Sequence, residues 1–218
     1  MRTTICGAAV IALAVALVGC NLVYSERPLF SAADAKNGPG LRIGLWLKRD
    51  AGCQFDETRP VRRWPKCAEW QLVRPTDVLG LDAQGRKWTQ YGYVLAAGQP
   101  RILQVAVQDP QVDGGRAEYF YLGLDPIRID PNGDVVEYRD WLVQCGPPPP
   151  TPPPEGKHPK LVEPQVTQAP LPGLVPHPDA DHPDDCSAQT AVAVRNAAQA
   201  SLAWSSTDNW RWVRSGGD

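Results

Sequence analysis

Apolar and polar residues alternate with a period of two through most of residues 41–145. The first such segment, residues 41–48, places Leu41, Ile43, Leu45 and Leu47 on one face. Period-two alternation over short segments is typical of strands that bury one face. The pattern predicts about seven to nine short strands, at residues 41–48, 70–73, 78–81, 86–93, 101–107, 117–124, 127–129, 135–138 and 141–145.

Turn-forming residues stand between these segments. They include Asp82-Ala83-Gln84-Gly85, Asp113-Gly114-Gly115 and the Asn132-Gly133 pair. Asn-Gly is a strong hairpin signal, and short connections of this kind join antiparallel neighbours. The predicted fold is therefore mainly β. We expect a small antiparallel meander, closed into a barrel or folded as a sandwich, with a C-terminal helix packed on it.

The composition changes abruptly at residue 146. Fourteen of the 23 prolines of the chain lie within residues 146–185, beginning with four in a row at 147–150. Such a segment favours the extended polyproline II conformation and cannot build a packed core. We expect residues 146–185 to be a solvated Pro-rich excursion rather than a domain.

An Ala-rich segment, residues 187–204, follows the excursion and has the periodicity of a helix. Asp184 or Asp185 is expected to cap its start. The predicted packing face consists of Ala191, Val194, Ala198 and Leu202. After the helix comes a Trp-rich tail, residues 210–213, whose two indoles share one side if it is extended. We interpret residues 186–218 as a helix and tail that pack back on the β-rich domain of residues 41–145.

The N-terminus has the layout of a secretory signal. Arg2 precedes an apolar run from Ile5 to Val18, which is about 14 residues long, whereas a helix needs about 20 to cross a bilayer. The tetrapeptide Leu17-Val18-Gly19-Cys20 resembles the lipobox of bacterial lipoproteins, in which small residues precede a cysteine whose thiol receives a diacylglyceryl group. We therefore expect residues 1–19 to be a signal peptide that is removed.

The resemblance implies that Cys20 becomes the lipidated N-terminus and carries two or three acyl chains, as a diacylglyceryl group with or without a further chain such as palmitate. At least two acyl chains are needed for stable anchoring. Asn21, not Asp, follows the cysteine, which favours the outer membrane with the protein facing the periplasm. Residues 20–40 are expected to be a lipidated tether, and the membrane is the first expected partner.

Four cysteines remain in the mature chain: Cys53, Cys67, Cys145 and Cys186. An even number of cysteines in an exported protein indicates disulfides, and four cysteines allow three pairings. We favour the sequential pairing, because Cys53 and Cys67 bracket one loop and Cys145 and Cys186 bracket the Pro-rich excursion. There is no C-x-x-C motif to suggest a redox or zinc site.

Charge and motifs disfavour several function classes. The formal net charge of −2 creates no field that would attract nucleic acid. The three His residues lie in the Pro-rich excursion, and no G-x-S-x-G, H-E-x-x-H or phosphate-binding Gly loop occurs. We expect no catalytic residue, cofactor or metal ion, and we interpret the His- and Asp-rich residues 177–186 as a solvated acidic linker.

The loop between the first two cysteines is rich in Arg and Trp. Arg62, Arg63 and Trp64 lie within it, and Trp70 follows it closely. A guanidinium group binds phosphate or carboxylate bidentately, and Arg stacks on indole. These four residues are therefore candidate binding residues for a lipid head group, a lipopolysaccharide phosphate or a glycan of the envelope, and a protein is also a conceivable partner.

Gly44-Leu45-Trp46, near the start of the first predicted strand, resembles the G-x-W motif of lipocalins. The resemblance implies an eight-stranded barrel that carries an apolar ligand, with the Trp at its closed end and a helix after the barrel. The Thr-Asp-Tyr motif of that family has no counterpart, Thr76-Asp77-Val78 being the nearest match. Our first hypothesis is a lipid-anchored envelope protein with a non-catalytic binding or structural role. A lipocalin-like carrier is the second, and an envelope hydrolase the third.

Overall fold

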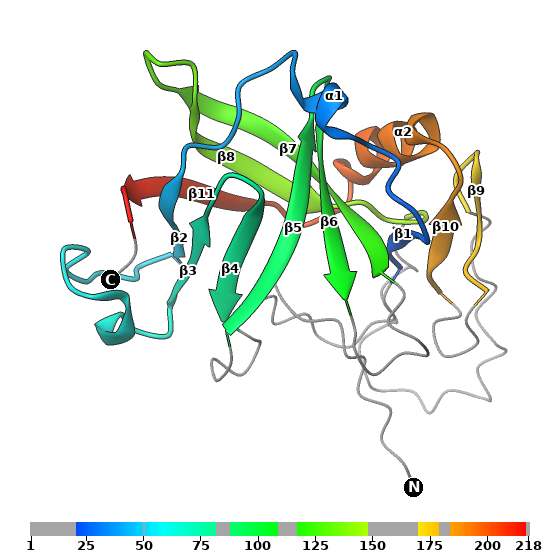
Figure 1. The fold of residues 1–218 in the computed structure, drawn as a ribbon. Coiled ribbons are helices and arrows are strands. Elements are labelled where there is room, and N and C mark those ends of the chain that lie inside the picture. Colours follow the sequence, from blue (N-terminus) through cyan, green and yellow to red (C-terminus); the bar gives the residue numbers. More distant parts are fainter. Residues whose placement is uncertain are drawn as a thin grey trace, which may run out of the picture.

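The computed structural model of this chain describes residues 21–49, 51–81, 88–108, 117–147, 170–178 and 184–216. Within these residues eight strands pair in a ring and form a closed antiparallel barrel (Figure 1). The barrel strands are β2 (Gly44–Arg49), β3 (Ala68–Val73), β4 (Asp77–Leu81), β5 (Trp88–Ala96), β6 (Arg101–Gln108), β7 (Ala117–Ile129), β8 (Val135–Leu142) and β11 (Asp208–Arg214). The prediction of a mainly β meander is confirmed in its barrel form.

The last strand closes the ring. β11 lies between β8 and β2, with Trp210 opposite Tyr138 and Trp212 opposite Trp46. The Trp-rich tail is therefore not a segment packed on the sheet but an integral barrel strand. Both indoles do lie on one side of it, because side chains two residues apart in a strand share a face.

A layer of apolar side chains fills one part of the barrel interior. Trp46 belongs to this layer and has no exposed surface, and its ring centroid lies 5.0 Å from that of Tyr138. Gly44 precedes it with φ at +135°, and a Cβ there would collide with the carbonyl oxygen of Arg214. The glycine of the G-x-W motif is thus required by the close approach of the last strand to the first.

Three short strands extend the sheet beyond β7. They are β1 (Val23–Ser25), β10 (Cys186–Ala188) and β9 (Leu174–Pro176), and a short helix α1 (Ala32–Ala35) follows β1. The prediction of a tether at residues 20–40 is wrong for its described part, because Val23 and Phe30 are buried in the core. The Pro-rich excursion likewise includes a strand, β9, in which Leu174 is buried.

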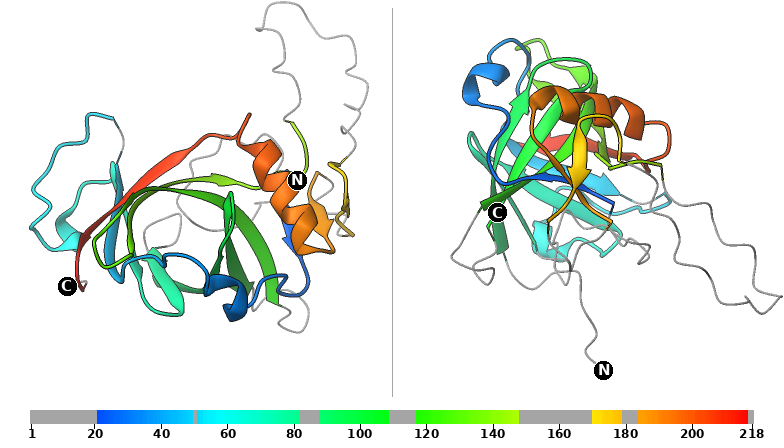
Figure 2. Two further views of the ribbon diagram at one scale, coloured as in Figure 1. Left: turned by 90° about the horizontal axis from the view of Figure 1, so that it is seen from above. Right: turned by 90° about the vertical axis from the view of Figure 1, so that its right-hand side faces the viewer.

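Helix α2 (Ala191–Ser201) packs on the outside of the barrel, against β7, β8 and β10 (Figure 2). The helix is shorter than expected, and Thr190 caps it by accepting a hydrogen bond from the amide of Ala193, so neither predicted Asp is the cap. Its buried residues are Ala193, Val194, Ala197, Ala198 and Ser201. Ala191 and Leu202 of the predicted face are only half-buried.

Two disulfides join the additions to the barrel, Cys53 to Cys67 and Cys145 to Cys186, which is the sequential pairing. The first closes the loop between β2 and β3, which contains a one-turn 3-10 helix, η1 (Val61–Arg63). The second ties the end of β8 to β10. Of the helices in the described residues, none is long and apolar enough to span a membrane.

Candidate functional site

The β2–β3 loop packs on a small apolar cluster of its own. Leu47 and Ala68 form the base of this cluster on the outer face of the barrel, next to the Cys53–Cys67 bond. Phe55 and Trp64 pack against it, with their ring centroids 5.1 Å apart. A disulfide-closed loop with an aromatic pair beneath it is a rigid support for the side chains it displays.

Ion pairs tie the same loop to the barrel. The carboxylate of Glu57 pairs with Arg211 of β11 and, at 3.5 Å, with Arg49 of β2. Arg214 donates to the backbone carbonyl oxygens of Glu57 at 2.6 Å and Arg59 at 3.4 Å. These three arginines therefore serve as supports, because their charges are directed into the loop.

Trp64 both stabilises the loop and exposes part of its indole to solvent. Its indole Nε1–H donates to the carbonyl oxygen of Arg59 at 2.9 Å, and the guanidinium carbon of Arg214 lies 5.8 Å from its ring centroid. The side chain remains half-exposed. An indole fixed at one edge and accessible on the remainder can contact a ligand without losing side-chain freedom on binding.

Arg62 and Arg63 stand on η1 as exposed cations. Lys66, three residues further, is exposed as well. Within the described part of the chain none of these three side chains has an ion pair or a hydrogen bond. The arginines that hold the loop are therefore engaged in ion pairs or hydrogen bonds, whereas these three cations remain exposed to solvent.

The four residues predicted from sequence are only partly brought together. Arg62, Arg63 and Trp64 share the loop surface, whereas Trp70 lies half-buried on β3 opposite Leu47 and is not a member of the loop cluster. Lys66 lies in the same basic stretch of the sequence but was not among the four predicted binding residues. Sequence reasoning also could not find Arg211 and Arg214, because they come from β11 and no local pattern relates them to this loop.

A second polar group lies inside the barrel, beside the apolar layer. The interior faces of β2, β3 and β11 carry Lys48, Glu69 and Asp208, and Lys48 pairs with both carboxylates at 2.7 and 3.0 Å. Asp140 of β8 lies opposite Asp208 and is 4% exposed. The indole Nε1 of Trp210, in the same region, has no hydrogen-bond acceptor among the described residues. We refer to Lys48, Glu69, Asp208 and Asp140 as the ionic layer.

Burial and charge set the protonation of this layer. Desolvation by burial opposes the charge of Lys48, but its hydrogen bonds to Glu69 and Asp208 prevail and raise its pKa. Burial, and then the nearby carboxylate of Asp208, raises the pKa of Asp140 to about 8. Lys48 is therefore a cation between two carboxylates, while Asp140 is largely neutral at pH 7.

The remaining sequence predictions concern the lipid anchor and metal binding. Cys20 and residues 1–19 lie outside the described residues. In His177, Nε2 lies 3.9 Å from Oε1 of Glu118, and the ring centroid lies 5.8 Å from that of Tyr24. Residues 179–183 of the same acidic stretch are outside the described part. No group of three His, Cys, Asp or Glu side chains in the described residues could hold a metal ion.

Comparison with known proteins adds no assignment: no protein-family model, no curated protein and no solved structure matches this chain.

Proposed function

We propose that this chain is a lipid-anchored protein of the bacterial envelope whose barrel presents a rigid cationic loop to phosphate groups of envelope lipids. The observation that carries the proposal is the set of three exposed cations, Arg62, Arg63 and Lys66, which have no ion pair within the described residues, whereas the other described charges of the loop are engaged. Arg and Lys bind phosphate well, and each contributes about 1 kcal/mol near an anionic membrane surface.

The anchor part of the proposal rests on the lipobox-like tetrapeptide Leu17-Val18-Gly19-Cys20. The fold supports a short link between this anchor and the barrel. The side-chain amide of Asn21, the residue after the cysteine, donates to the backbone carbonyl oxygen of Gly146 at 2.8 Å. The backbone carbonyl oxygen of Asn21 accepts a hydrogen bond from the backbone amide of Cys145 at 3.0 Å. Acyl chains on Cys20 would therefore keep the barrel close to the membrane surface.

A carrier of apolar ligands receives less support. The interior around Trp46 is filled by side chains. An apolar ligand beside the ionic layer would displace water from its charged groups and offer them no hydrogen bond in return. A hydrolase also receives less support, because Lys48 is engaged as a cation by two carboxylates.

The loop is tested with the mature chain carrying Cys20→Ser, so that acyl chains do not provide attachment. Sedimentation with phosphatidylglycerol vesicles should show binding that weakens at high ionic strength, and phosphatidylcholine vesicles should bind little. The double variant Arg62→Gln/Arg63→Gln should bind about 30-fold more weakly, because two cations worth about 1 kcal/mol each are lost.

The matched control is Lys36→Gln/Arg128→Gln, which removes the same charge from exposed positions outside the loop, at the end of α1 and on β7. Equal weakening by the two double variants would mean that only net charge matters and would refute the loop proposal. The anchor is tested separately by intact-mass analysis of the membrane fraction, and an unmodified N-terminus would refute that part.

A further inference from the structure

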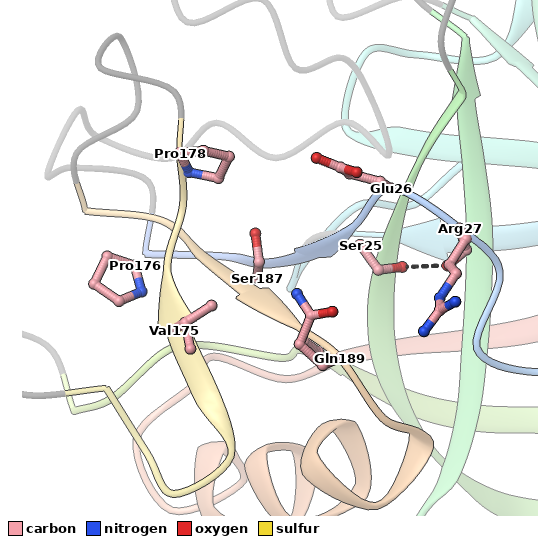
Figure 3. Close-up of a pocket in the computed structure, with 9 residues that line it drawn as sticks. Ser25, Glu26, Arg27, Val175, Pro176, Pro178, Ser187 and Gln189 are labelled. Atoms are coloured by element: carbon pink, nitrogen blue, oxygen red, sulfur yellow. Dashed lines mark hydrogen bonds between the residues drawn. The ribbon is translucent and has the colours of Figure 1, made fainter.

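A pocket of about 590 Å³ lies outside the barrel, on the three-stranded extension formed by β1, β10 and β9 (Figure 3). Volumes of about 300–1,000 Å³ are usual for small-molecule sites. The pocket is on the opposite side of the barrel from the β2–β3 loop, as Figures 1 and 2 show. It is therefore a different site, and nothing in the argument for it depends on the cationic loop.

One wall of the pocket carries two opposite charges. Glu26 and Arg27 follow the end of β1, and both side chains are exposed. Neither side chain has an ion pair or hydrogen bond within the described part of the chain, and the same holds for Gln189 beside them. In Figure 3 the carboxylate of Glu26 extends toward Pro178, whereas the guanidinium of Arg27 extends toward Gln189. The two charges are thus presented separately instead of neutralising each other.

The floor of the pocket provides a hydroxyl group. Ser187 of β10 is 7% exposed, and its side chain has no hydrogen-bond partner among the described residues. Figure 3 shows this side chain rising from the middle strand between the two walls. Its oxygen is accessible from the pocket, so the hydroxyl can exchange hydrogen bonds with a polar group bound there.

The opposite wall is apolar. It consists of Val175, Pro176 and Pro178, from β9 and the segment that follows it. Val175 is 45% exposed, one of the larger apolar side chains of the described surface that remain uncovered. A ligand with an apolar body would remove this surface from water, while its polar ends would face the other wall.

We propose that this pocket binds a short peptide in zwitterionic form, of about dipeptide size. Its α-ammonium group pairs with Glu26, its carboxylate pairs with Arg27, and its apolar side chains lie on Val175 and the two prolines. Ser187 hydrogen-bonds to the peptide group between the two ends. A carboxylate and a guanidinium held apart on one wall select a ligand that has both charges over one that has a single charge.

The probe is the dipeptide Leu-Leu, titrated into the mature chain in a calorimeter. We expect a Kd of about 1 mM or lower. Its N-acetyl derivative and its C-terminal amide each lack one terminal charge, and each should bind about fivefold more weakly, as expected for one partly exposed ion pair. Absence of Leu-Leu binding, or equal binding of all three probes, would overturn the proposal.

Variants assign each end of the probe. In Glu26→Gln the N-acetyl derivative should bind as well as Leu-Leu, because the partner of the ammonium group is gone, while amidation should still weaken binding. In Arg27→Gln the pattern should be reversed. Lys36→Gln, at the exposed end of α1 and outside the pocket lining, is the charge-matched control and should respond as the unmodified chain does. If each variant weakened the binding of all three probes equally, the proposed pairing of Glu26 with the ammonium group and Arg27 with the carboxylate would be refuted.

Discussion

The two sides of the barrel carry additions of similar covalent design but different physical character. On one side, the Cys53–Cys67 bond closes a loop that is held by Glu57 and the arginines of β2 and β11. On the other side, the Cys145–Cys186 bond joins β10 and α2 to the barrel, and apolar side chains such as Val194 fill the contact. We refer to the first as the ionic side and to the second as the apolar side.

The difference shows that the features that stabilise the fold and the features that expose cations to solvent lie on different sides of the barrel. Buried apolar area stabilises a fold by about 25 cal/mol per Å², but it must be hidden from solvent to do so. Ion pairs at a surface contribute little free energy, yet they fix geometry and leave neighbouring cations in water. The apolar side is therefore expected to contribute most of the stability, and the ionic side to present the exposed cations.

The largest effect should come from charging the apolar side. Val194 has no exposed surface, so Val194→Asp would bury an unpaired carboxylate and is expected to destabilise the fold by about 5 kcal/mol. Leu202→Asp, at a half-buried position, should cost less. Val192→Asp, on the same helix at 66% exposure, is the control and should be nearly neutral. Thermal unfolding of the three variants measures the order, and a damaging Val192 variant would contradict the assigned face.

Opening the two disulfides compares the two sides directly. The bond on the apolar side spans 41 residues and the one on the ionic side spans 14. The chain-entropy relation gives about 4 and about 3 kcal/mol for loops of these lengths. Cys145→Ala/Cys186→Ala should therefore destabilise the protein more than Cys53→Ala/Cys67→Ala in denaturant unfolding. The reverse order would mean that the loop contributes more to the fold than its ion pairs indicate.

The ionic layer inside the barrel should make stability depend on pH. The pKa of Asp140 is about 8 in the folded state and has an ordinary value of 3.8 when unfolded. The folded state therefore binds more protons between these values. The stabilisation is complete below about pH 4 and is lost as the pH rises through about 8, with a slope of at most about 1.4 kcal/mol per pH unit.

Asp140→Asn should remove this dependence, because an amide does not titrate. Denaturant unfolding at about pH 5 and about pH 8 measures the difference. The exposed Asp125→Asn, at 53% side-chain exposure, is the control and should keep the dependence of the unmodified chain. An Asp140→Asn variant that loses as much stability between the two pH values as the unmodified chain would disprove the assignment.

The smallest effect should follow from weakening the ionic side. Glu57→Gln removes the carboxylate that pairs with Arg49 and Arg211, both partly exposed, so the expected loss of stability is about 0.5 kcal/mol. The same variant should loosen the support of the cationic loop and weaken vesicle binding, although it makes the protein less negative. A gain in binding would mean that net charge outweighs loop geometry.

Much of the fold was predictable from local patterns. Period-two alternation located the barrel strands, because a strand with one face in the core must alternate. The Asn132-Gly133 pair does lie in the turn between β7 and β8, where Gly133 has φ at +90°. The helix face was only partly predicted, since Ala193 and Ala197 pack as well as the larger Val194 and small residues carry a weak hydrophobic signal.

The sequence alone determined the strand content, the interruption by proline and the basic loop, all of which depend on residues close together in the chain. It only favoured the sequential disulfide pairing over two alternatives. Tertiary structure alone decided the rest. The Trp-rich tail became β11 because the gap between β8 and β2 offered its backbone hydrogen-bond partners, and its arginines thereby reached the β2–β3 loop. Likewise Glu26 and Ser187, 161 residues apart in the chain, share a pocket because β1 pairs with β10. Such contacts have no local signal, since their free energy appears only when distant segments meet.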